Sequence, residues 1–194
     1  MPHLTRLPGA TERLVFQGGT ERLPRTPFHF NLLRRIFELP AMGRGRLMRT
    51  LIRRHLGLPA SVNMNPGFFC STGRLHCGEC VDLADTFFLD YAPVYIGECT
   101  WFSYRNTVIT AERDYDCVRA RPVVIGRNVW VTTNVTILPG VRIGDNSVIG
   151  AGSVVVSDVP ANVMAAGNPC RPIREIDRRC RVRCDGRPIC IPDR

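Results

Sequence analysis

Residues 125–155 read IGRNVWVTTNVTILPGVRIGDNSVIGAGSVV, and an aliphatic residue returns at every sixth position of this stretch. The aliphatic positions are Ile125, Val131, Ile137, Ile143, Ile149 and Val155. A second set of small or β-branched residues precedes them by two positions: Val123, Val129, Val135, Val141, Ser147 and Ser153. The apolar stripe of an α-helix recurs about every 3.6 residues, so a period of six excludes a helix here.

The repeat predicts a solenoid with flat walls and sharp corners. Six is a multiple of two, so each unit holds a short strand whose alternate side chains point inward. Three units close one coil, and successive coils stack at the strand spacing of about 4.8 Å. We therefore predict an all-β solenoid, a left-handed parallel β-helix of hexapeptide repeats. A sandwich of alternating strands would not hold one phase over six units.

The same spacing continues toward the N-terminus. Three upstream residues keep the period: Ile96, Phe102 and Val108. Three earlier residues are also six positions apart: Cys77, Leu83 and Leu89. A slip in register separates them from Ile96. The solenoid is therefore expected to begin well before the regular stretch, with a less regular first coil.

The chain divides into three parts around this repeat. We expect an irregular arm and capping helices over residues 1–60, the β-helix domain over residues 61–170, and an extension rich in arginine and cysteine over residues 171–194. Within the β-helix domain, residues 110–123 break the repeat and are predicted to protrude as a loop. Protruding loops of repeat proteins often carry the functional residues.

The N-terminal part contains two helical patterns. Residues 1–28 are punctuated by proline and glycine and are expected to be irregular, whereas residues 29–38 and 46–56 predict short helices. Four apolar residues of the second helix share one face: Leu47, Leu51, Ile52 and Leu56. Terminal coils of a solenoid need a cover, so we expect this face to cap the end of the β-helix.

The net charge of +9 is concentrated at the two ends of the chain. The first 60 residues hold 11 arginines against 3 acidic residues, and the last 24 hold 8 against 4. Neither predicted helix interleaves these arginines with aromatic residues that could stack on bases. No apolar run approaches the roughly 20 residues of a membrane span, and the opening residues lack the apolar core of a signal peptide. We expect a cytoplasmic protein with neither a nucleic acid nor a membrane as its partner.

Nine cysteines without a signal peptide predict reduced thiols rather than a disulfide framework. Cys77 and Cys80 have the spacing of half a zinc site, but Cys77 falls on an inward position, where a buried thiol packs as a small apolar group. We interpret the cysteines of the extension as free thiols: Cys180, Cys184 and Cys190. No three-histidine set is present, so no metal is expected.

Residues 125–176 resemble the C-terminal half of the galactoside/maltose O-acetyltransferase family. The motifs that carry the resemblance are NVW, LPGV, IGAGS and AGNP, in that order. The upstream stretch NPGFFCSTGRLHCGECVDLADTFFLDYAPVYIG, residues 65–97, is similar to the first coil of the family and one residue shorter. The resemblance implies a trimeric enzyme, with three active sites between neighbouring chains, that transfers acetyl from acetyl-CoA to a hydroxyl of a sugar-like acceptor.

The resemblance also implies which residues bind the cofactor. Positions that line the pantetheine arm fall on Thr133 and Ala151, and the arginines that bind phosphate fall on Arg171 and Arg174. A guanidinium group suits phosphate because its planar fork makes two parallel hydrogen bonds. Acetyl-CoA is therefore the expected co-substrate.

The acceptor side departs from the family. Relatives carry a catalytic histidine in the protruding loop, in a pattern like T-A-x-H, whereas this chain has Thr110-Ala111-Glu112-Arg113 and no histidine in the loop. An arginine cannot accept a proton at neutral pH, because its pKa stays above about 12. By the same resemblance, a family asparagine that contacts the acceptor falls on the deletion, at Asp82 or Leu83, so this contact is altered. Asp85 is a further polar candidate for the acceptor site.

Three interpretations of the missing histidine remain open. Glu112 or Asp114 could act as the carboxylate base, its pKa raised by burial between subunits. Arg113 could instead hold an anionic acceptor or acyl group while another residue supplies the base. The third interpretation is a catalytically inactive trimeric scaffold. We take the acetyltransferase, with Glu112, Arg113 and Asp114 as catalytic candidates, as the main prediction.

Overall fold

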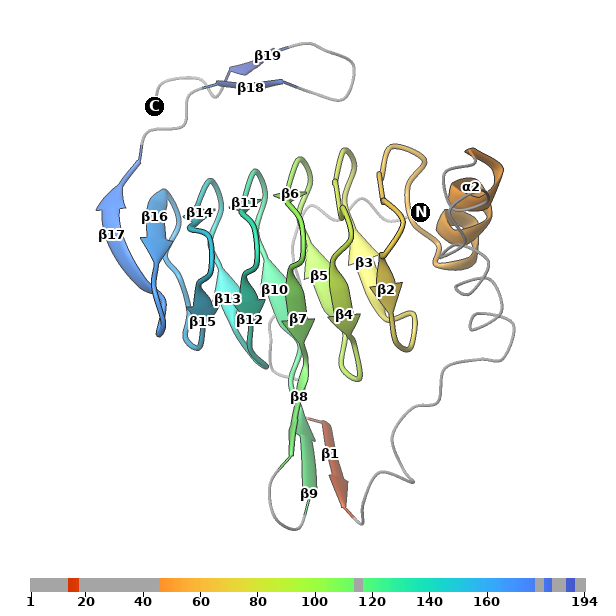
Figure 1. Ribbon diagram of the computed structural model, residues 1–194, viewed down its shortest axis with the longest axis horizontal. Coiled ribbons are helices and arrows are strands. Elements are labelled where there is room, and N and C mark those ends of the chain that lie inside the picture. Colours follow the sequence, from red (N-terminus) through yellow and green to blue (C-terminus); the bar gives the residue numbers. More distant parts are fainter. Residues whose placement is uncertain (1–13, 18–45, 114–116, 177–179, 183–187, 191–194) are drawn as a thin grey trace.

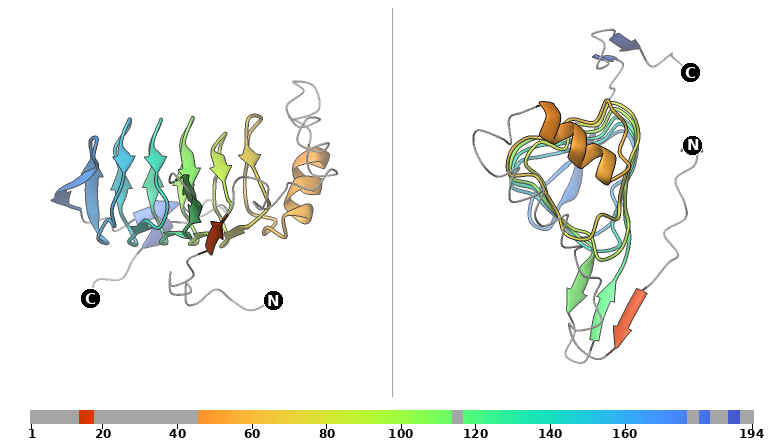
Figure 2. Two further views of the ribbon diagram at one scale, coloured as in Figure 1. Left: turned by 90° about the horizontal axis from the view of Figure 1, so that it is seen from below. Right: turned by 90° about the vertical axis from the view of Figure 1, so that its right-hand side faces the viewer.

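The computed structural model describes residues 14–17, 46–113, 117–176, 180–182 and 188–190. Most of its strands form the three walls of a prism, seen from the side in Figure 1 and end-on in Figure 2. The first wall contains β3 (Leu75–Cys77), β5 (Val94–Ile96), β10 (Val123–Ile125) and β13 (Arg142–Ile143). The second contains β6 (Trp101–Phe102), β11 (Trp130–Val131), β14 (Val148–Ile149), β16 (Val163–Ala166) and β17 (Arg171–Glu175). The third contains β2 (Phe69–Cys70), β4 (Phe87–Leu89), β7 (Thr107–Ile109), β12 (Thr136–Ile137) and β15 (Val154–Val155).

The strands of each wall pair in parallel, except β17, and the register confirms the predicted β-helix. Val131 pairs with Ile149, and Ile137 pairs with Val155, so one coil takes 18 residues, or three six-residue units. The twelve repeat positions between Val123 and Val155 are all buried. They form ladders of side chains along the inside of the prism, which is the hydrophobic core.

One expected inward position in the first coils is wrong. Phe88 is completely buried, whereas Leu89 is only half-buried. Phe88 pairs with Val108, so Phe88 holds the inward position and lies five residues after Leu83 instead of six. The turn between them is shortened at Ala84, whose φ of 46° lies in the left-handed region.

Three edges join the walls. The edge between the first and second walls, here called the asparagine edge, carries Asn128, Asn146 and Asn162, all with φ between 55° and 61°. Asparagine tolerates this conformation better than most residues. The side chains form a ladder: the Asn128 amide donates to Asn146 Oδ1 at 2.7 Å, and the Asn146 amide donates to Asn162 Oδ1 at 2.9 Å.

Glycine permits the coils to stack closely at the same edge. A Cβ atom on Gly144 would lie 2.4 Å from the backbone nitrogen of Ala161, and one on Gly97 would lie 2.6 Å from that of Arg127. Both contacts are with backbone, which cannot move aside as a flexible side chain can. These two positions therefore require glycine.

Helix α2 (Arg46–His55) covers the N-terminal end of the prism (Figure 1). The prediction of a capping helix is confirmed, but the face is only partly as expected. Met48 and Ile52 are buried in the core, whereas Leu47 and Leu51 are 73% and 41% exposed. The Arg53 guanidinium fastens the helix to the first coil by donating to the carbonyls of Ala60 at 2.8 Å and Val62 at 3.0 Å. The predicted helix 29–38 lies outside the described residues.

The segment that interrupts the repeat forms a hairpin that projects from the prism (Figure 2). Its strands are β8 (Ala111–Arg113) and β9 (Cys117–Ala120), and they pair antiparallel. A third strand, β1 (Leu14–Gln17), pairs antiparallel with β9, so the segment expected to be irregular contains a strand. The hairpin leaves the edge between the third and first walls, here called the hairpin edge.

The C-terminal extension begins with β17, which pairs antiparallel with β16 at the end of the prism. Two further strands, β18 (Cys180–Val182) and β19 (Pro188–Cys190), pair with each other. The prediction of reduced thiols is wrong for Cys80, which is disulfide-bonded. Cys77 is a buried thiol, as the packing interpretation expects.

Candidate functional site

Thr133 and Ala151 lie on successive coils at one edge of the prism. This edge joins the second and third walls, and we call it the Thr133 edge. The backbone N–H of Gly152 donates to the Thr133 carbonyl at 3.0 Å, which fixes the two coils relative to each other. Both Thr133 and Ala151 are exposed. A Cβ atom on Gly152 would meet no atom within 4 Å, so this part of the edge is open for a ligand.

The turn after β16 continues the Thr133 edge by one more coil. The Gly167 N–H donates to Ser153 Oγ at 3.1 Å, and its carbonyl accepts the Val154 N–H at 3.0 Å. Gly167 has a φ of 108°, a conformation that favours glycine. The turn therefore leads the chain from the open edge directly into β17.

A β-bulge in β17 places two arginines on one face of the sheet. Arg171 pairs with Ala166 and Arg174 pairs with Met164, while Ile173 has no partner in the register. Ala166 and Met164 are two residues apart and therefore lie on the same face of the sheet. In a regular strand Arg171 and Arg174, three residues apart, would point to opposite faces. The bulge thus places both exposed residues on the same face of the sheet. The Arg171 guanidinium also donates to the Cys170 carbonyl at 2.9 Å and to Ser157 Oγ at 3.5 Å.

The two aspartates predicted for the acceptor site lie at the N-terminal end of the same region. Asp85 is on the Thr133 edge, and its Oδ1 accepts the Arg105 N–H at 2.7 Å. Asp82 faces outward on the second wall, where its backbone forms an isolated parallel β-bridge with Trp101 of the next coil. Its Oδ2 accepts the Asn63 amide at 3.1 Å, and its Oδ1 accepts the Ala84 N–H at 2.9 Å. Both carboxylates are held in place and remain half-exposed.

Two of the three predicted catalytic residues, Glu112 and Arg113, lie on the projecting hairpin. Glu112 is exposed, and its Oε1 accepts from the Arg121 guanidinium at 2.9 Å in an ion pair. Arg113 is also exposed, and among the described residues its guanidinium has no hydrogen-bond or ion-pair partner. Asp114, the other proposed base, lies outside the described residues.

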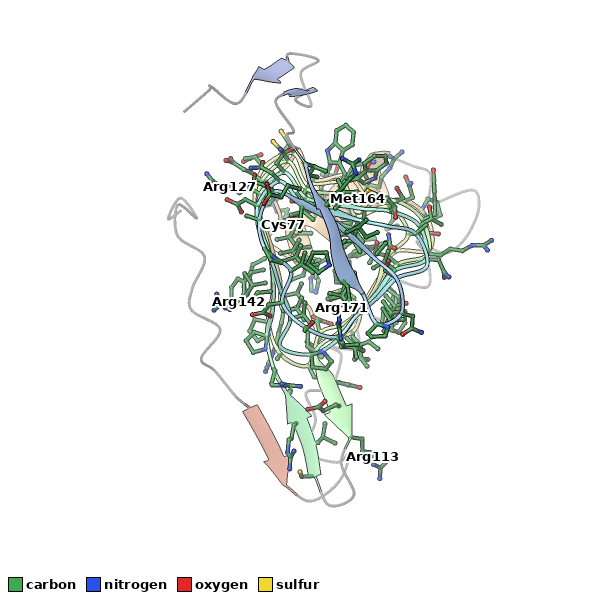
Figure 3. The ribbon with its side chains drawn as sticks, turned by 90° about the vertical axis from the view of Figure 1, so that its left-hand side faces the viewer. Cys77, Arg113, Arg127, Arg142, Met164 and Arg171 are labelled. Atoms are coloured by element: carbon green, nitrogen blue, oxygen red, sulfur yellow. The ribbon has the colours of Figure 1, made fainter. Side chains whose placement is uncertain are left out.

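One chain does not bring these two groups of residues together. The hairpin leaves the edge between the third and first walls, whereas Thr133 and Ala151 lie between the second and third. Figure 3 shows Arg171 at the C-terminal end of the prism and Arg113 far out on the hairpin. A site that uses both groups needs residues from two chains.

Three exposed aromatic residues beside the Thr133 edge were not predicted as functional. Trp101 and Trp130 pair across β6 and β11 on the outer face of the second wall and are 43% and 42% exposed. Tyr104, on the edge itself, is 59% exposed. The signal was present in the sequence, because Trp101 and Trp130 each precede an inward residue, Phe102 and Val131, and must point outward.

A buried carboxylate near the hairpin edge was also missed. Asp90 is completely buried, and its side chain accepts the backbone N–H groups of Thr72 at 2.8 Å and Arg74 at 2.6 Å. The Cys70 thiol donates to the same carboxylate at 3.2 Å. Burial, together with the negative charge of Asp90, raises the pKa of Cys70 well above its usual range, so this thiol stays neutral and is not a nucleophile. Asp90 is best explained as an anchor for the edge that carries the hairpin.

Two kinds of feature are absent from the described part of the chain. No three histidine, cysteine, aspartate or glutamate side chains there are placed to hold a metal ion. No described helix is long and apolar enough to cross a bilayer.

Comparisons with known proteins identify the family. Residues 122–157 match the family described as "Bacterial transferase hexapeptide (six repeats)". The structure is similar to that of a maltose O-acetyltransferase from Clostridium difficile 630, with a TM-score of 0.71 and 35% identity over 77% of this chain and 86% of that one. The chain belongs to the galactoside/maltose O-acetyltransferase family of hexapeptide-repeat proteins.

Other members of the family agree with this assignment. A galactoside acetyltransferase in complex with coenzyme A matches with a TM-score of 0.70 and 32% identity, over 84% of this chain and 86% of that one. Galactoside O-acetyltransferase of Escherichia coli is 66% identical over 58 residues, 30% of this chain and 29% of that protein. The Saccharomyces cerevisiae protein YJL218W is 41% identical over 130 residues, 60% of this chain and 64% of that protein. The matched part thus spans less than two thirds of these two curated relatives.

Proposed function

We propose that this member of the family is an acetyl-CoA-dependent O-acetyltransferase whose acceptor is a hydroxyl of a sugar or similar small molecule. The observation that carries the proposal is the open Thr133 edge that leads into two arginines on one face. A long, narrow ligand with phosphates at one end fits this arrangement, because guanidinium groups bind phosphate in pairs of hydrogen bonds. The bound coenzyme A named for the related galactoside acetyltransferase supports it.

The reaction is a direct transfer. A base removes the proton of the acceptor hydroxyl, the oxygen attacks the thioester carbonyl, and CoA leaves as its thiol. The residues we propose for cofactor binding are Thr133 and Ala151 along the arm and Arg171 and Arg174 at the phosphates. The base is a carboxylate of the hairpin, Glu112 or Asp114.

The active unit we propose is a homotrimer. Closed rings are the common form of symmetric oligomers, and in a threefold ring every interface joins one edge of a chain to a different edge of its neighbour. The hairpin of one chain then reaches the Thr133 edge of the next. This arrangement supplies both groups of residues to each site, which a single chain keeps on different edges.

Cofactor binding is the first test. Acetyl-CoA should raise the melting temperature of the wild-type protein by mass action. Arg171→Ala and Arg174→Ala should each weaken acetyl-CoA binding by about 10- to 100-fold, the loss of charge-assisted hydrogen bonds worth about 1.5–3 kcal/mol. Arg142→Ala is the matched control, because Arg142 is an exposed arginine of the first wall (Figure 3). Equal effects of all three substitutions would contradict the proposed phosphate site.

Catalysis is the second test. Release of CoA thiol should depend on an added sugar acceptor, and Glu112→Gln should reduce it if Glu112 is the base. A protein that binds acetyl-CoA but transfers nothing to any acceptor is a scaffold. In that case Arg113→His is the informative variant, because regained activity would identify a former enzyme that lost its loop histidine.

The shared site is tested by mixing chains. A Glu112→Gln chain and an Arg171→Ala chain, each impaired alone, should regain about a quarter of wild-type activity when co-expressed in equal amounts, because a quarter of the sites then combine two intact contributions. If each site lay within a single chain, co-expression of the two variants would restore no activity. Analytical ultracentrifugation should give the mass of three chains.

A further inference from the structure

The outer face of the second wall carries an aromatic surface made of Trp101, Trp130 and Tyr104. Trp101 and Trp130 are register partners on adjacent parallel strands, so their side chains lie one above the other about 4.8 Å apart at the backbone. The Trp130 indole N–H donates to Ser103 Oγ at 3.2 Å, which fixes the orientation of its ring. The next residues of the same ladder are Val148 and Met164. The wall therefore does not need aromatic rings at these positions to form.

Oriented carboxylates border this surface on its N-terminal side. Asp82 is the next rung of the ladder beyond Trp101, and Asp85 lies on the edge next to Tyr104. Each carboxylate oxygen has two acceptor sites, and the contacts with Asn63, Ala84 and Arg105 occupy only some of them. A flat aromatic ring with carboxylates at its border offers an apolar platform and acceptors for hydroxyl groups. A pyranose matches both, because it has an apolar C–H face and a rim of hydroxyls.

The surface is continuous with the edge proposed to bind the cofactor. The Asn134 N–H donates to the Tyr104 carbonyl at 3.0 Å, so Tyr104 lies one coil before Thr133. From Arg171 the edge runs through Ala151 and Thr133 to Tyr104, with Trp101 beside it on the wall. A cofactor whose phosphates lie at Arg171 directs its acyl end toward this aromatic surface.

We propose that Trp101 is a specificity-determining residue that stacks against the pyranose ring of the acceptor. The inference rests on the proposed function and adds to it the residue that selects the acceptor and the place where the acceptor binds. Asp82 and Asp85 accept hydrogen bonds from the hydroxyls of the same sugar. An aromatic ring provides a large rigid contact area with few rotatable bonds, which suits the recognition of a rigid ring.

Binding is tested by the fluorescence of Trp101. The chain has two tryptophans, so Trp130→Phe leaves Trp101 as the single reporter. Titration with maltose and with methyl β-D-galactoside, in the presence of CoA, should change this fluorescence in a saturable way for at least one sugar. Glycerol, which has hydroxyls but no ring, is the control and should not. An unchanged signal with both sugars would overturn the proposal.

The second test measures the KM values for the sugar and for acetyl-CoA. Trp101→Ala should raise the KM for the sugar about tenfold, with the KM for acetyl-CoA unchanged, and Trp101→Phe should retain most of the wild-type value. Tyr95→Ala, which removes an aromatic ring from the outer face of the first wall, is the matched control and should leave both constants unchanged. An unchanged KM for the sugar in Trp101→Ala would overturn the inference.

Two further results separate this proposal from its alternatives. If acetyl-CoA fails to stabilise the wild-type protein, the proposed function itself is wrong. If Trp101→Ala lowers the sedimenting mass while the KM for the sugar stays the same, the aromatic surface is an interface between copies of the chain, and the sugar site is overturned.

Discussion

The C-terminal coils and the first coils of the solenoid share one interior and differ at their edges. In the C-terminal coils the left-handed turn positions are asparagine or glycine, for example Asn128, Asn146 and Gly152. In the first coils the same conformation is adopted by Ala84 and Cys99. The regular half carries the predicted cofactor positions, and the irregular half carries the two aspartates together with Trp101 and Tyr104 of the aromatic surface. The half that departs from the repeat is thus the half proposed to select the acceptor.

The largest expected effect tests the register of the first coils. Phe88→Ala should destabilise the protein by about 3–5 kcal/mol, because it empties a completely buried inward position. Leu89→Ala, at a half-buried outward position, should cost less than about 2 kcal/mol. Urea unfolding measures both. If the two losses were reversed, Leu89 would be the inward residue, and the first coil would keep the six-residue period.

A second substitution tests close stacking in the regular half. Gly144→Ala should cost about 3 kcal/mol, because the new Cβ would lie 2.4 Å from the backbone nitrogen of Ala161. Gly152→Ala is the matched control: its Cβ would meet nothing within 4 Å, and only its φ of 69° costs about 1 kcal/mol. Equal losses in thermal or urea unfolding would show that the coils do not pack as tightly at the asparagine edge as the structure has them.

A smaller change should make the irregular half resemble the regular one. Cys99 has a φ of 56° and lies on the asparagine edge one coil before Asn128. Cys99→Asn should stabilise the protein by about 1 kcal/mol, because asparagine tolerates this conformation and extends the amide ladder by one rung. Cys99→Ser, which can do neither, should stay near the wild-type stability. A Cys99→Asn protein no more stable than Cys99→Ser would contradict this account of the edge.

The walls could be predicted from the sequence because their signal is periodic. Each inward position is fixed by burial, and burial selects aliphatic residues at Ile125, Val131 and every sixth residue after them. The position of Phe88 could not be predicted in this way. It depends on a left-handed turn at Ala84, and alanine gives no sign of that conformation.

The candidate site was predictable by residue but not by arrangement. Arg171 and Arg174 were selected by resemblance, yet their common face depends on the bulge at Ile173, which no residue type marks. The separation of Glu112 from Thr133 depends on which edge the hairpin leaves, and that follows only from counting strands around the prism. The outward direction of Trp101, by contrast, follows from the repeat itself.

The smallest expected effect concerns the outer face of the first wall, far from the aromatic surface. His76 is exposed on this face and stacks on Tyr95, with ring centroids 5.1 Å apart, and partial removal from water lowers the pKa of His76 below its usual 6.5. As the pH falls, the imidazole of the unfolded chain therefore binds its proton before that of the folded chain. The contribution of the neutral His76 imidazole to stability is complete above about pH 6.5 and is lost as the pH falls through the folded pKa. His76→Phe keeps the stacked ring and removes the titration. The melting temperature of the wild type should fall slightly more between pH 7.5 and pH 5 than that of His76→Phe; identical falls would show that the imidazole is as easily protonated in the folded wall as in the unfolded chain.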